Sequence, residues 1–195
     1  MNKSIDFYFD FISPYAFLAH KKNREFEKKN KIKINYKPIL LGGLHNVLGI
    51  TAPAFINAKA KFMIRDCKMI AEKNKVKFKF NSYFPIRTLN LMRGVLIAQE
   101  DDIQDFYINK IFDSIWRDGL NMNDQIIVEK VVKNMDINPK TFFLRASGQS
   151  IKTLLKNKTD EAYGKGVFGA PTFYINNKIF WGQDRLEFAI VEAKK

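Results

Sequence analysis

The first forty residues combine strand-like and helix-like hydrophobic patterns. Residues 3–11 (KSIDFYFDF) are rich in Phe, Tyr and Ile and predict a buried strand. Residues 31–40 (KIKINYKPIL) alternate polar and apolar side chains and predict a second strand. Between them, apolar residues recur at helical spacing from Pro14 to about Asn30, and three should face inward: Phe17, Leu18 and Phe26. A strand, a helix and a strand in this order form a βαβ unit, so the two strands should be parallel.

The junction between the first strand and the helix carries Ser13 followed by Pro14. Serine is favoured at the N-cap of a helix and proline at the first helical position. On this local pattern alone, Ser13 and Pro14 are the start of a helix. Whether the Ser13 hydroxyl also carries chemistry stays open at this point.

The middle of the chain, about residues 44–165, shows apolar residues at helical spacing and no convincing strand. The pattern recurs in these stretches: AKAKFMIRDCKMIAEK, TLNLMRGVLIAQ, DFYINKIFDSIWRDG, DQIIVEKVVKNM and KTFFLRASGQSIKTLLKNKTDEAYGKG. The segment NMNDQ indicates a loop that leads to an N-cap, and INPK places Pro139 near the first turn of a helix. We predict an all-helical block of about five or six helices here.

Strand signals return after Val167. The stretch APTFYINNKIFWG contains two short strands joined by Asn176 and Asn177, a pair typical of a tight hairpin turn. The segment QDRLEFAIVEAKK predicts a closing helix that begins at Gln183 or Asp184. The end of the chain is therefore expected to be a ββα unit.

These patterns predict an α/β fold in which a large all-helical insertion separates a βαβ half from a ββα half. The two halves, residues 1–43 and 167–195, should form one domain with a four-stranded mixed sheet, and residues 44–166 the inserted helical domain. The hydrophobic fraction of 46% and the 18 Phe residues are ample for a packed core.

Cysteine content and hydropathy limit the cellular setting. Cys67 is the one cysteine, which excludes an intramolecular disulfide and fits a reducing compartment. No apolar stretch approaches the roughly 18 uncharged residues that a membrane span needs. The segment MNKSIDFYFD has acids within its apolar run and no small-residue cleavage site, so we interpret it as a strand and not a signal peptide. We expect a cytoplasmic protein without a membrane partner.

The net charge of +13 comes from 33 Lys and Arg residues against 20 Asp and Glu residues. Such an excess can indicate a nucleic-acid partner. Here the lysines are spread along predicted helix faces and form no dense block, which favours a solvated basic surface. We expect no nucleic-acid partner, whereas attraction of an anionic small substrate remains compatible with the charge. No metal-ligand cluster or phosphate-binding glycine loop is visible.

Several motifs resemble one family. FDFISPYAFLA is similar to the D-x-x-S-P-Y-x-[YFW]-L segment of kappa-class glutathione transferases and 2-hydroxychromene-2-carboxylate isomerases, within the DsbA-like thioredoxin-fold superfamily. GVFGAPTFYINNKIFWGQDRLEF resembles the G-V-F-G-V-P-T-F…F-W-G-Q-D-R-L segment of that family. Its sequence is most similar to the form of this segment in the bacterial isomerases. NAKAKFMIRDCKMIAE and YFPIRTLNLMRGVLIAQE resemble its helical motifs. The resemblance implies a thioredoxin-like fold, glutathione as cofactor and a homodimer.

Ser13 is the candidate catalytic residue. Redox relatives of this fold have C-x-x-C at the position of Ser13 to Ala16, and dithiol–disulfide exchange needs two thiols that this chain lacks. The N-terminus of a helix favours an anion, and a hydroxyl beside it can donate a hydrogen bond to a bound thiolate. We therefore interpret Ser13 as a stabiliser of the glutathione thiolate and not as a nucleophile. A plain N-cap role is the alternative, and both roles can hold at once.

The resemblance also implies the residues that bind glutathione: Ser13, Pro14, Tyr15, Ile50, Ala170, Pro171, Gln183 and Asp184. Pro171 occupies the place of the family's cis-proline, and the backbone of Ala170 would pair with the glutathione cysteine like an added strand. Gln183 and Asp184 would hold the γ-glutamyl end, with Asp184 facing its ammonium group. A trans proline in an ordinary turn and a plain N-cap at Asp184 are the alternatives.

The sequence departs from the family pattern at two positions near the expected pockets. Ile50 follows Gly49 where the family commonly has an Asn that contacts glutathione through its side chain, so only the Ile50 backbone could make such a contact. Arg87 stands where an Asn is usual. Lys59 matches a recurring lysine of the family and is a tentative partner of a substrate carboxylate, as is Arg87. A solvated helix lysine is an equal alternative for Lys59.

The resemblance implies a glutathione-dependent isomerase similar to 2-hydroxychromene-2-carboxylate isomerase, acting on a conjugated aromatic acid. One alternative is kappa-type transfer, in which glutathione stays on an electrophile. The other is a basic binding or chaperone-like module without enzymatic activity, which would tolerate Ser13→Ala.

Overall fold

The computed structural model describes residues 4–195. Its sheet has four strands in the order β2-β1-β3-β4: β1 (Ser4–Phe9), β2 (Lys33–Pro38), β3 (Thr172–Ile175) and β4 (Lys178–Trp181). β1 and β2 are parallel, whereas β3 is antiparallel to β1 and to β4. The predicted mixed sheet is thus confirmed, although residue 3 of the expected first strand lies outside the described residues.

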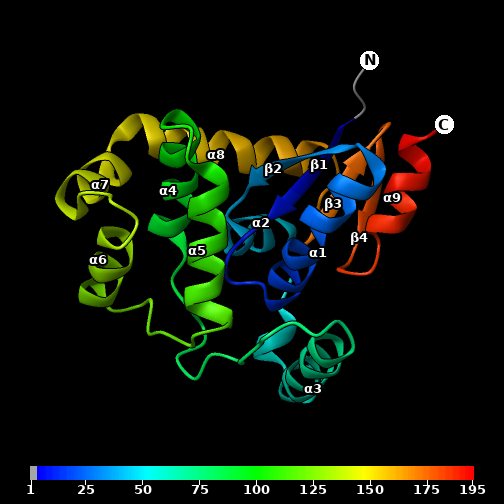
Figure 1. The fold of residues 1–195 in the computed structure, drawn as a ribbon, viewed down its shortest axis with the longest axis horizontal. Helices are drawn as coiled ribbons and strands as arrows, with labels where there is room; N and C mark the ends of the chain where they lie inside the picture. Colours follow the sequence, from blue (N-terminus) through cyan, green and yellow to red (C-terminus); the bar gives the residue numbers. More distant parts are fainter. Residues whose placement is uncertain (1–3) are drawn as a thin grey trace.

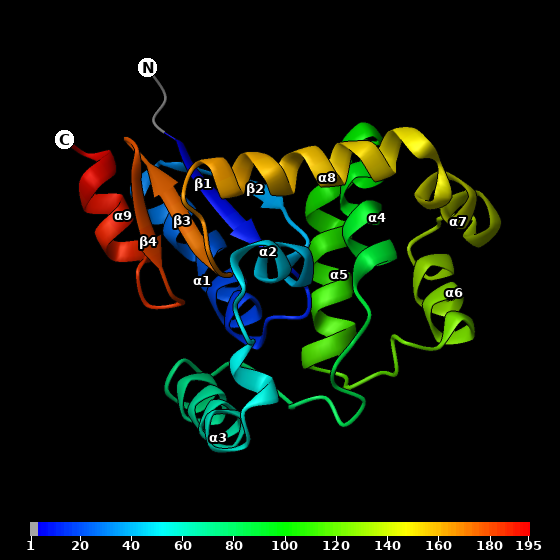
Figure 2. The ribbon, with the colours of Figure 1, turned by 180° about the vertical axis from the view of Figure 1, so that it is seen from behind.

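Two helices cover each face of the sheet (Figures 1 and 2). α1 (Pro14–Asn30) and α9 (Leu186–Ala193) lie on one face, and α2 (Leu41–Leu48) and the C-terminal part of α8 (Gln149–Gly164) lie on the other. The bounds of α1 agree with the sequence-based prediction. This α/β arrangement of βαβ and ββα halves is the expected thioredoxin-like fold.

The helical segment between the two halves contains α3 (Asn57–Lys73), α4 (Leu89–Glu100), α5 (Gln104–Trp116), α6 (Gln125–Lys133) and α7 (Pro139–Ser147), and ends in α8. A short 3-10 helix, η1 (Pro53–Phe55), precedes α3. No strand occurs between residues 57 and 164, as predicted. The last helical stretch divides into α7 and α8 at Gly148. α2, whose sequence LGGLHNVL has two glycines in its first turn, was not predicted.

Side chains alternate between the two faces of the sheet along β1, and this alternation assigns them to two hydrophobic clusters. Ile5, Phe7 and Phe9 point to one face and join a large cluster with α1, α4 and α5, while Tyr8 joins a smaller cluster on the other face. The largest fully buried side chains of the main cluster are Trp116, Tyr107, Phe7, Phe9, Phe11, Phe17, Phe112, Phe142 and Phe173. The core therefore runs without a break from the sheet into the helical segment. The division into domains at residues 43 and 167 stays a prediction.

The predicted hairpin is confirmed, whereas the predicted start of the closing helix is wrong. Asn176 and Asn177 have φ values of 49° and 58°, which a tight turn of this type requires, and they join β3 to β4 as predicted. The closing helix α9 begins at Leu186, so the expected start at Gln183 or Asp184 was wrong. Gly182, at a φ of 129°, starts a turn that holds these two residues outside the helix. Among residues 4–195, no helix is long and apolar enough to cross a membrane, and no potential metal-binding group of His, Cys, Asp or Glu is found.

Candidate active site

Ser13 follows the C-terminal end of β1, a central strand of the sheet, and directly precedes α1. Its side-chain Oγ accepts a hydrogen bond from the Ala16 N–H at 3.1 Å, so Ser13 is the N-cap that the sequence predicts. The backbone N–H of Ser13 donates to the Asp10 carbonyl at 3.1 Å. The residue is buried, with 6% of its surface exposed. The helix start therefore fixes the Ser13 hydroxyl in place.

The Ser13 hydroxyl also joins the two halves of the fold. Its Oγ donates to the Ala170 carbonyl oxygen at 2.9 Å, across 157 residues of sequence. The Ala170–Pro171 bond is cis, as the sequence resemblance implies. The Gly182 N–H donates to the Pro171 carbonyl at 3.0 Å, which places the turn with Gln183 beside this loop. Ser13, Ala170 and Pro171, three predicted site residues, are thus brought together.

The first turn of α1 leaves one backbone donor for a ligand. Pro14 has no N–H, and the Ala16 N–H is bound to Ser13. The Tyr15 N–H has no partner among residues 4–195. The Tyr15 hydroxyl, in contrast, donates to Asp66 on α3 at 2.8 Å, and burial raises its pKa. Any contact of Tyr15 with an anion beside Ser13 would therefore come from its backbone.

Asp10 supports the loop of residues 10–13 (the Ser13 loop), a role that was not predicted from the sequence. Its buried carboxylate accepts hydrogen bonds from the Ile12 N–H at 3.1 Å, the Leu41 N–H at 2.8 Å and the Thr88 hydroxyl at 2.6 Å. Burial raises the pKa of Asp10, and these donors oppose the shift. The carboxylate links the Ser13 loop to the starts of α2 and α4. The Asp of the D-x-x-S-P-Y motif was the available signal, but its partners are distant in sequence.

Gln183 and Asp184 differ in their environment. The Gln183 Oε1 atom is buried and has no hydrogen-bond partner among the described residues. Asp184 is exposed and pairs with Arg185 at 3.2 Å. The N-cap of α9 is Arg185, without a side-chain cap, so the alternative of Asp184 as a plain N-cap is wrong. The turn thus offers one unsatisfied acceptor and one accessible carboxylate.

The remaining predicted residues lie on other segments. The Ile50 N–H donates to the His45 carbonyl at 2.9 Å, so the Ile50 backbone can offer only its carbonyl to a ligand. Lys59 is exposed on α3, and Arg87 is exposed in the loop before α4. No hydrogen bond joins Lys59 or Arg87 to Ser13 within residues 4–195. Their roles toward a substrate stay predictions.

The arrangement suits anion recognition and not thiol redox chemistry of the chain itself. Cys67 is buried on α3, and burial, reinforced by nearby Asp66, raises its pKa to about 12. It is therefore a poor nucleophile at neutral pH. The groups that converge near Ser13 are its hydroxyl, the Tyr15 N–H and the Ala170 carbonyl. Together they can bind a thiolate that carries a peptide backbone.

Comparison with known proteins agrees with this geometry. Residues 4–190 match the family model described as DSBA-like thioredoxin domain. The chain is 32% identical over 193 residues to a 2-hydroxychromene-2-carboxylate isomerase of Sphingobium xenophagum, covering 96% of both chains. It is 27% identical over 196 residues to glutathione S-transferase kappa 1 of Caenorhabditis elegans, covering 93% of this chain and 86% of the relative. The chain therefore belongs to the DSBA-like thioredoxin family, together with these isomerases and kappa-class transferases.

Comparison of structures supports the same fold. A solved structure of a 2-hydroxychromene-2-carboxylate isomerase superposes with a TM-score of 0.86 at 21% identity, covering 98% of this chain and 93% of the other. This match extends over both the sheet and the helical segment.

Proposed function

We propose that the chain is a glutathione-dependent isomerase of the 2-hydroxychromene-2-carboxylate isomerase type, with Ser13 as the stabiliser of the glutathione thiolate. The relatives that support the reaction class are enzymes named for isomerase and glutathione transferase activity. The observation that carries the role of Ser13 is its hydroxyl, held at a helix start and directed at the Ala170 carbonyl.

The residues around Ser13 fit glutathione. The unpaired, buried Gln183 Oε1 needs a donor, which an ammonium or amide N–H of the tripeptide would supply. The exposed Asp184 carboxylate suits the γ-glutamyl ammonium, and the Tyr15 N–H suits a thiolate. When bound, glutathione would supply a thiolate that adds reversibly to the conjugated acid and allows rotation about the former double bond.

An exchange of hydrogen bonds would activate Ser13. In this structure the one proton of the Ser13 hydroxyl is donated to the Ala170 carbonyl. A peptide N–H that pairs with Ala170 in the manner of an added strand would take over that carbonyl. The Ser13 proton would then be free to turn toward a thiolate, while its Oγ still accepts from Ala16. Binding of the peptide and stabilisation of the thiolate are thereby coupled through one carbonyl.

The expected size of this stabilisation is modest. A hydrogen bond to a charged group contributes about 1.5–3 kcal/mol, and a neutral one about 0.5–1.5 kcal/mol. Replacing the neutral bond to Ala170 by a charged bond to the thiolate favours the thiolate by about 1–1.5 kcal/mol, or about one pKa unit. From an ordinary thiol pKa of about 8.5, this raises the thiolate from a few per cent to a substantial minority at neutral pH.

The direct experiment is an isomerase assay with 2-hydroxychromene-2-carboxylate. We expect ring opening to a trans-benzylidenepyruvate that depends on glutathione, with the glutathione concentration unchanged at the end. Ser13→Ala should lower the rate at neutral pH by about tenfold, the equivalent of one pKa unit. Activity without glutathione, or an unaffected Ser13→Ala variant, would refute the proposal. The absence of any activity would favour a non-enzymatic binding module.

A kappa-type transferase is the second candidate, because a relative of that name covers most of the chain. The same thiolate would serve this reaction, but glutathione would remain attached to an electrophile. Chromatography of the products separates the two: consumption of glutathione, one molecule for each substrate molecule, indicates transfer.

Lys59 and Arg87 remain candidates for contact with the substrate carboxylate, since both are exposed cations. Lys59 lies on α3, which accepts a hydrogen bond from Tyr15 at Asp66. Arg87 precedes Thr88, which donates to Asp10. Exposed apolar side chains on η1 and α3, Phe55 at 68% and Phe62 at 52%, support a homodimer, which light scattering at micromolar concentration tests. A cytoplasmic location fits the single buried thiol.

A further inference from the structure

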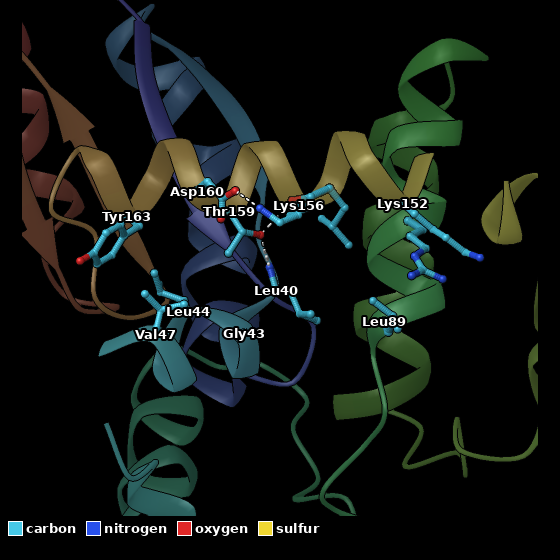
Figure 3. Close-up of a pocket in the computed structure, with 12 residues that line it drawn as sticks. Leu40, Gly43, Leu44, Val47, Leu89, Lys152, Lys156, Thr159, Asp160 and Tyr163 are labelled. Atoms are coloured by element: carbon cyan, nitrogen blue, oxygen red, sulfur yellow. Dashed lines mark hydrogen bonds and ion pairs between the residues drawn. The ribbon is translucent and has the colours of Figure 1, made fainter. Parts of the chain in front are cut away.

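An elongated groove lies between α2, α8 and the N-terminal part of α4, and none of the predicted site residues lines it (Figure 3). Its volume is about 290 Å³. The walls are mainly aliphatic side chains: Leu40, Leu44, Val47, Leu89 and Leu155. One face of α8 forms the length of the groove from Lys152 to Tyr163, a rise of about 16 Å at standard helix geometry. The groove therefore has the shape of a channel for a chain-like molecule.

Cations gather at one end of this groove. Arg93, on α4, and Lys152, on α8, both line it, and Figure 3 shows Lys152 at the end opposite Tyr163. The Arg93 guanidinium donates to Asn90 at 3.2 Å and to the Ala146 carbonyl at 3.3 Å, while its buried Nε has no partner within residues 4–195. Neither cation forms an ion pair with an acid of the described residues. Burial lowers the pKa of Arg93.

The acids of this region are already neutralised. Asp160, which lines the groove, pairs with Lys156 at 2.5 Å. Glu100 and Asp101, at the far end of α4, pair with Arg145 at 2.8 Å and 2.6 Å. Arg93 and Lys152 are thus left as uncompensated positive charge beside an apolar channel. A partly buried guanidinium without an acid partner costs free energy of desolvation unless a bound anion pairs with it.

We propose that this groove binds a linear amphipathic carboxylate, such as a medium-chain fatty acid, with the carboxylate at Arg93 and Lys152 and the chain along α8. Guanidinium groups recognise carboxylates through paired N–H donors, and the aliphatic walls would cover the chain. The proposal does not rest on the function assigned to Ser13, because the two sites share no residue.

The test uses octanoate as the probe and calorimetry of the full chain as the measurement. We expect saturable one-to-one binding of octanoate, and none of octylamine or octanol at the same concentration. Octanoate has no conjugated double bond, so it cannot act as an acceptor for a thiolate. Saturating glutathione should leave octanoate binding unchanged, and displacement by glutathione would overturn the assignment to the groove.

Two neighbouring glycines of α2 provide a matched pair of variants. Gly43 lines the groove, and a Cβ there would lie 3.4 Å from the flexible Leu40 side chain, whereas a Cβ at Gly42 would meet nothing within 4 Å. Gly43→Leu should fill the groove and abolish octanoate binding, and Gly42→Leu should bind as the parent chain does. Equal binding by both variants would refute the proposal.

The charged end is tested separately. Arg93→Gln should weaken octanoate binding by about tenfold or more, the scale of one charged hydrogen bond. Arg93 also donates a hydrogen bond to the Ala146 carbonyl, so its replacement can affect the fold as well as binding. Lys152→Gln is therefore the companion variant: Lys152 is exposed, and its replacement should weaken binding by a smaller factor without changing the fold. Lys130→Gln, an exposed lysine on α6, is its control. Unchanged binding in both Arg93→Gln and Lys152→Gln would contradict the predicted orientation.

Discussion

Two of the seams along which the helical segment meets the thioredoxin-like half differ in how completely side chains fill them. The closed seam lies on the α1 side of the sheet and consists of Phe11, Phe17, His20, Phe112 and Trp116, each at most 3% exposed. The Phe112 ring lies 4.8 Å from Phe11 and 5.1 Å from His20 between ring centroids. The open seam is the groove between α2, α4 and α8, where aliphatic walls surround about 290 Å³.

Hydrogen bonds satisfy several polar groups of the closed seam, although the buried Asn23 Oδ1 near Tyr36 has no partner among residues 4–195. In the closed seam, the Trp116 indole donates to the Phe11 carbonyl at 2.8 Å, and His20 contacts the Tyr36 hydroxyl at 2.7 Å. In the open seam, the buried Arg93 Nε has no partner among the described residues. The closed seam holds the Ser13 loop in position, whereas the open seam has the properties of a binding surface.

Removal of Trp116 should have the largest effect. Trp116→Ala empties the centre of the closed seam and leaves the Phe11 carbonyl without its donor, so the free energy of unfolding should fall by about 3–5 kcal/mol. Trp181→Ala is the matched control, because Trp181 is 53% exposed and should cost far less. Urea titration followed by circular dichroism measures both. Similar losses in the two variants would show that the seam is not the centre of stability.

Acid should lower the free energy of unfolding because His20 is buried in the closed seam. Burial lowers the pKa of His20 from 6.5 to about 3, so between these values the unfolded chain binds a proton that the folded chain excludes. The contribution of His20 to the free energy of unfolding should therefore be fully present above pH 6.5. The free energy of unfolding should then fall by about 2 kcal/mol between pH 6.5 and 5. His20→Gln should remove most of this slope, and His45→Gln, at a half-buried site, should retain it. A slope that survives in His20→Gln would contradict the assignment.

The Asp10 carboxylate should connect stability with the Ser13 site. An amide at this position has one acceptor oxygen in place of two, so Asp10→Asn should leave a buried donor unpaired and cost about 1–3 kcal/mol. Because Asp10 positions the Ser13 loop, glutathione should also bind more weakly, as calorimetry would measure. Asp6→Asn is the control on the same strand, since its carboxylate is partly exposed beside Lys37. Glutathione affinity equal to that of the parent chain in Asp10→Asn would argue against the positioning role.

The elements that could be predicted from the sequence are those with local signals. The βαβ unit, the Ser13–Pro14 helix start and the Asn176–Asn177 hairpin each follow from periodicity, capping or turn chemistry within a few residues. The resemblance to a known family implied roles for Ala170 and Pro171, which the structure places beside Ser13.

What could not be predicted depends on contacts distant in sequence. α2 forms although two glycines disfavour a helix, because its first turn donates to Asp10 and Gly49 ends it in the left-handed conformation. The Asp10–Thr88 bond joins residues 78 positions apart. The unpaired state of Arg93 depends on where α4, α7 and α8 pack, and no local pattern encodes it.

The central claim is that the Ser13 hydroxyl stabilises a thiolate, and the pKa of bound glutathione tests it most directly. The ultraviolet absorbance of the thiolate, followed against pH at saturating glutathione, should give a pKa about one unit higher in Ser13→Ala than in the parent chain. Ser13→Gly should show the same increase while keeping most of the helix stability, because glycine is tolerated at an N-cap. A thiol pKa that is unchanged in both variants, with the fold intact, would reduce Ser13 to a helix cap.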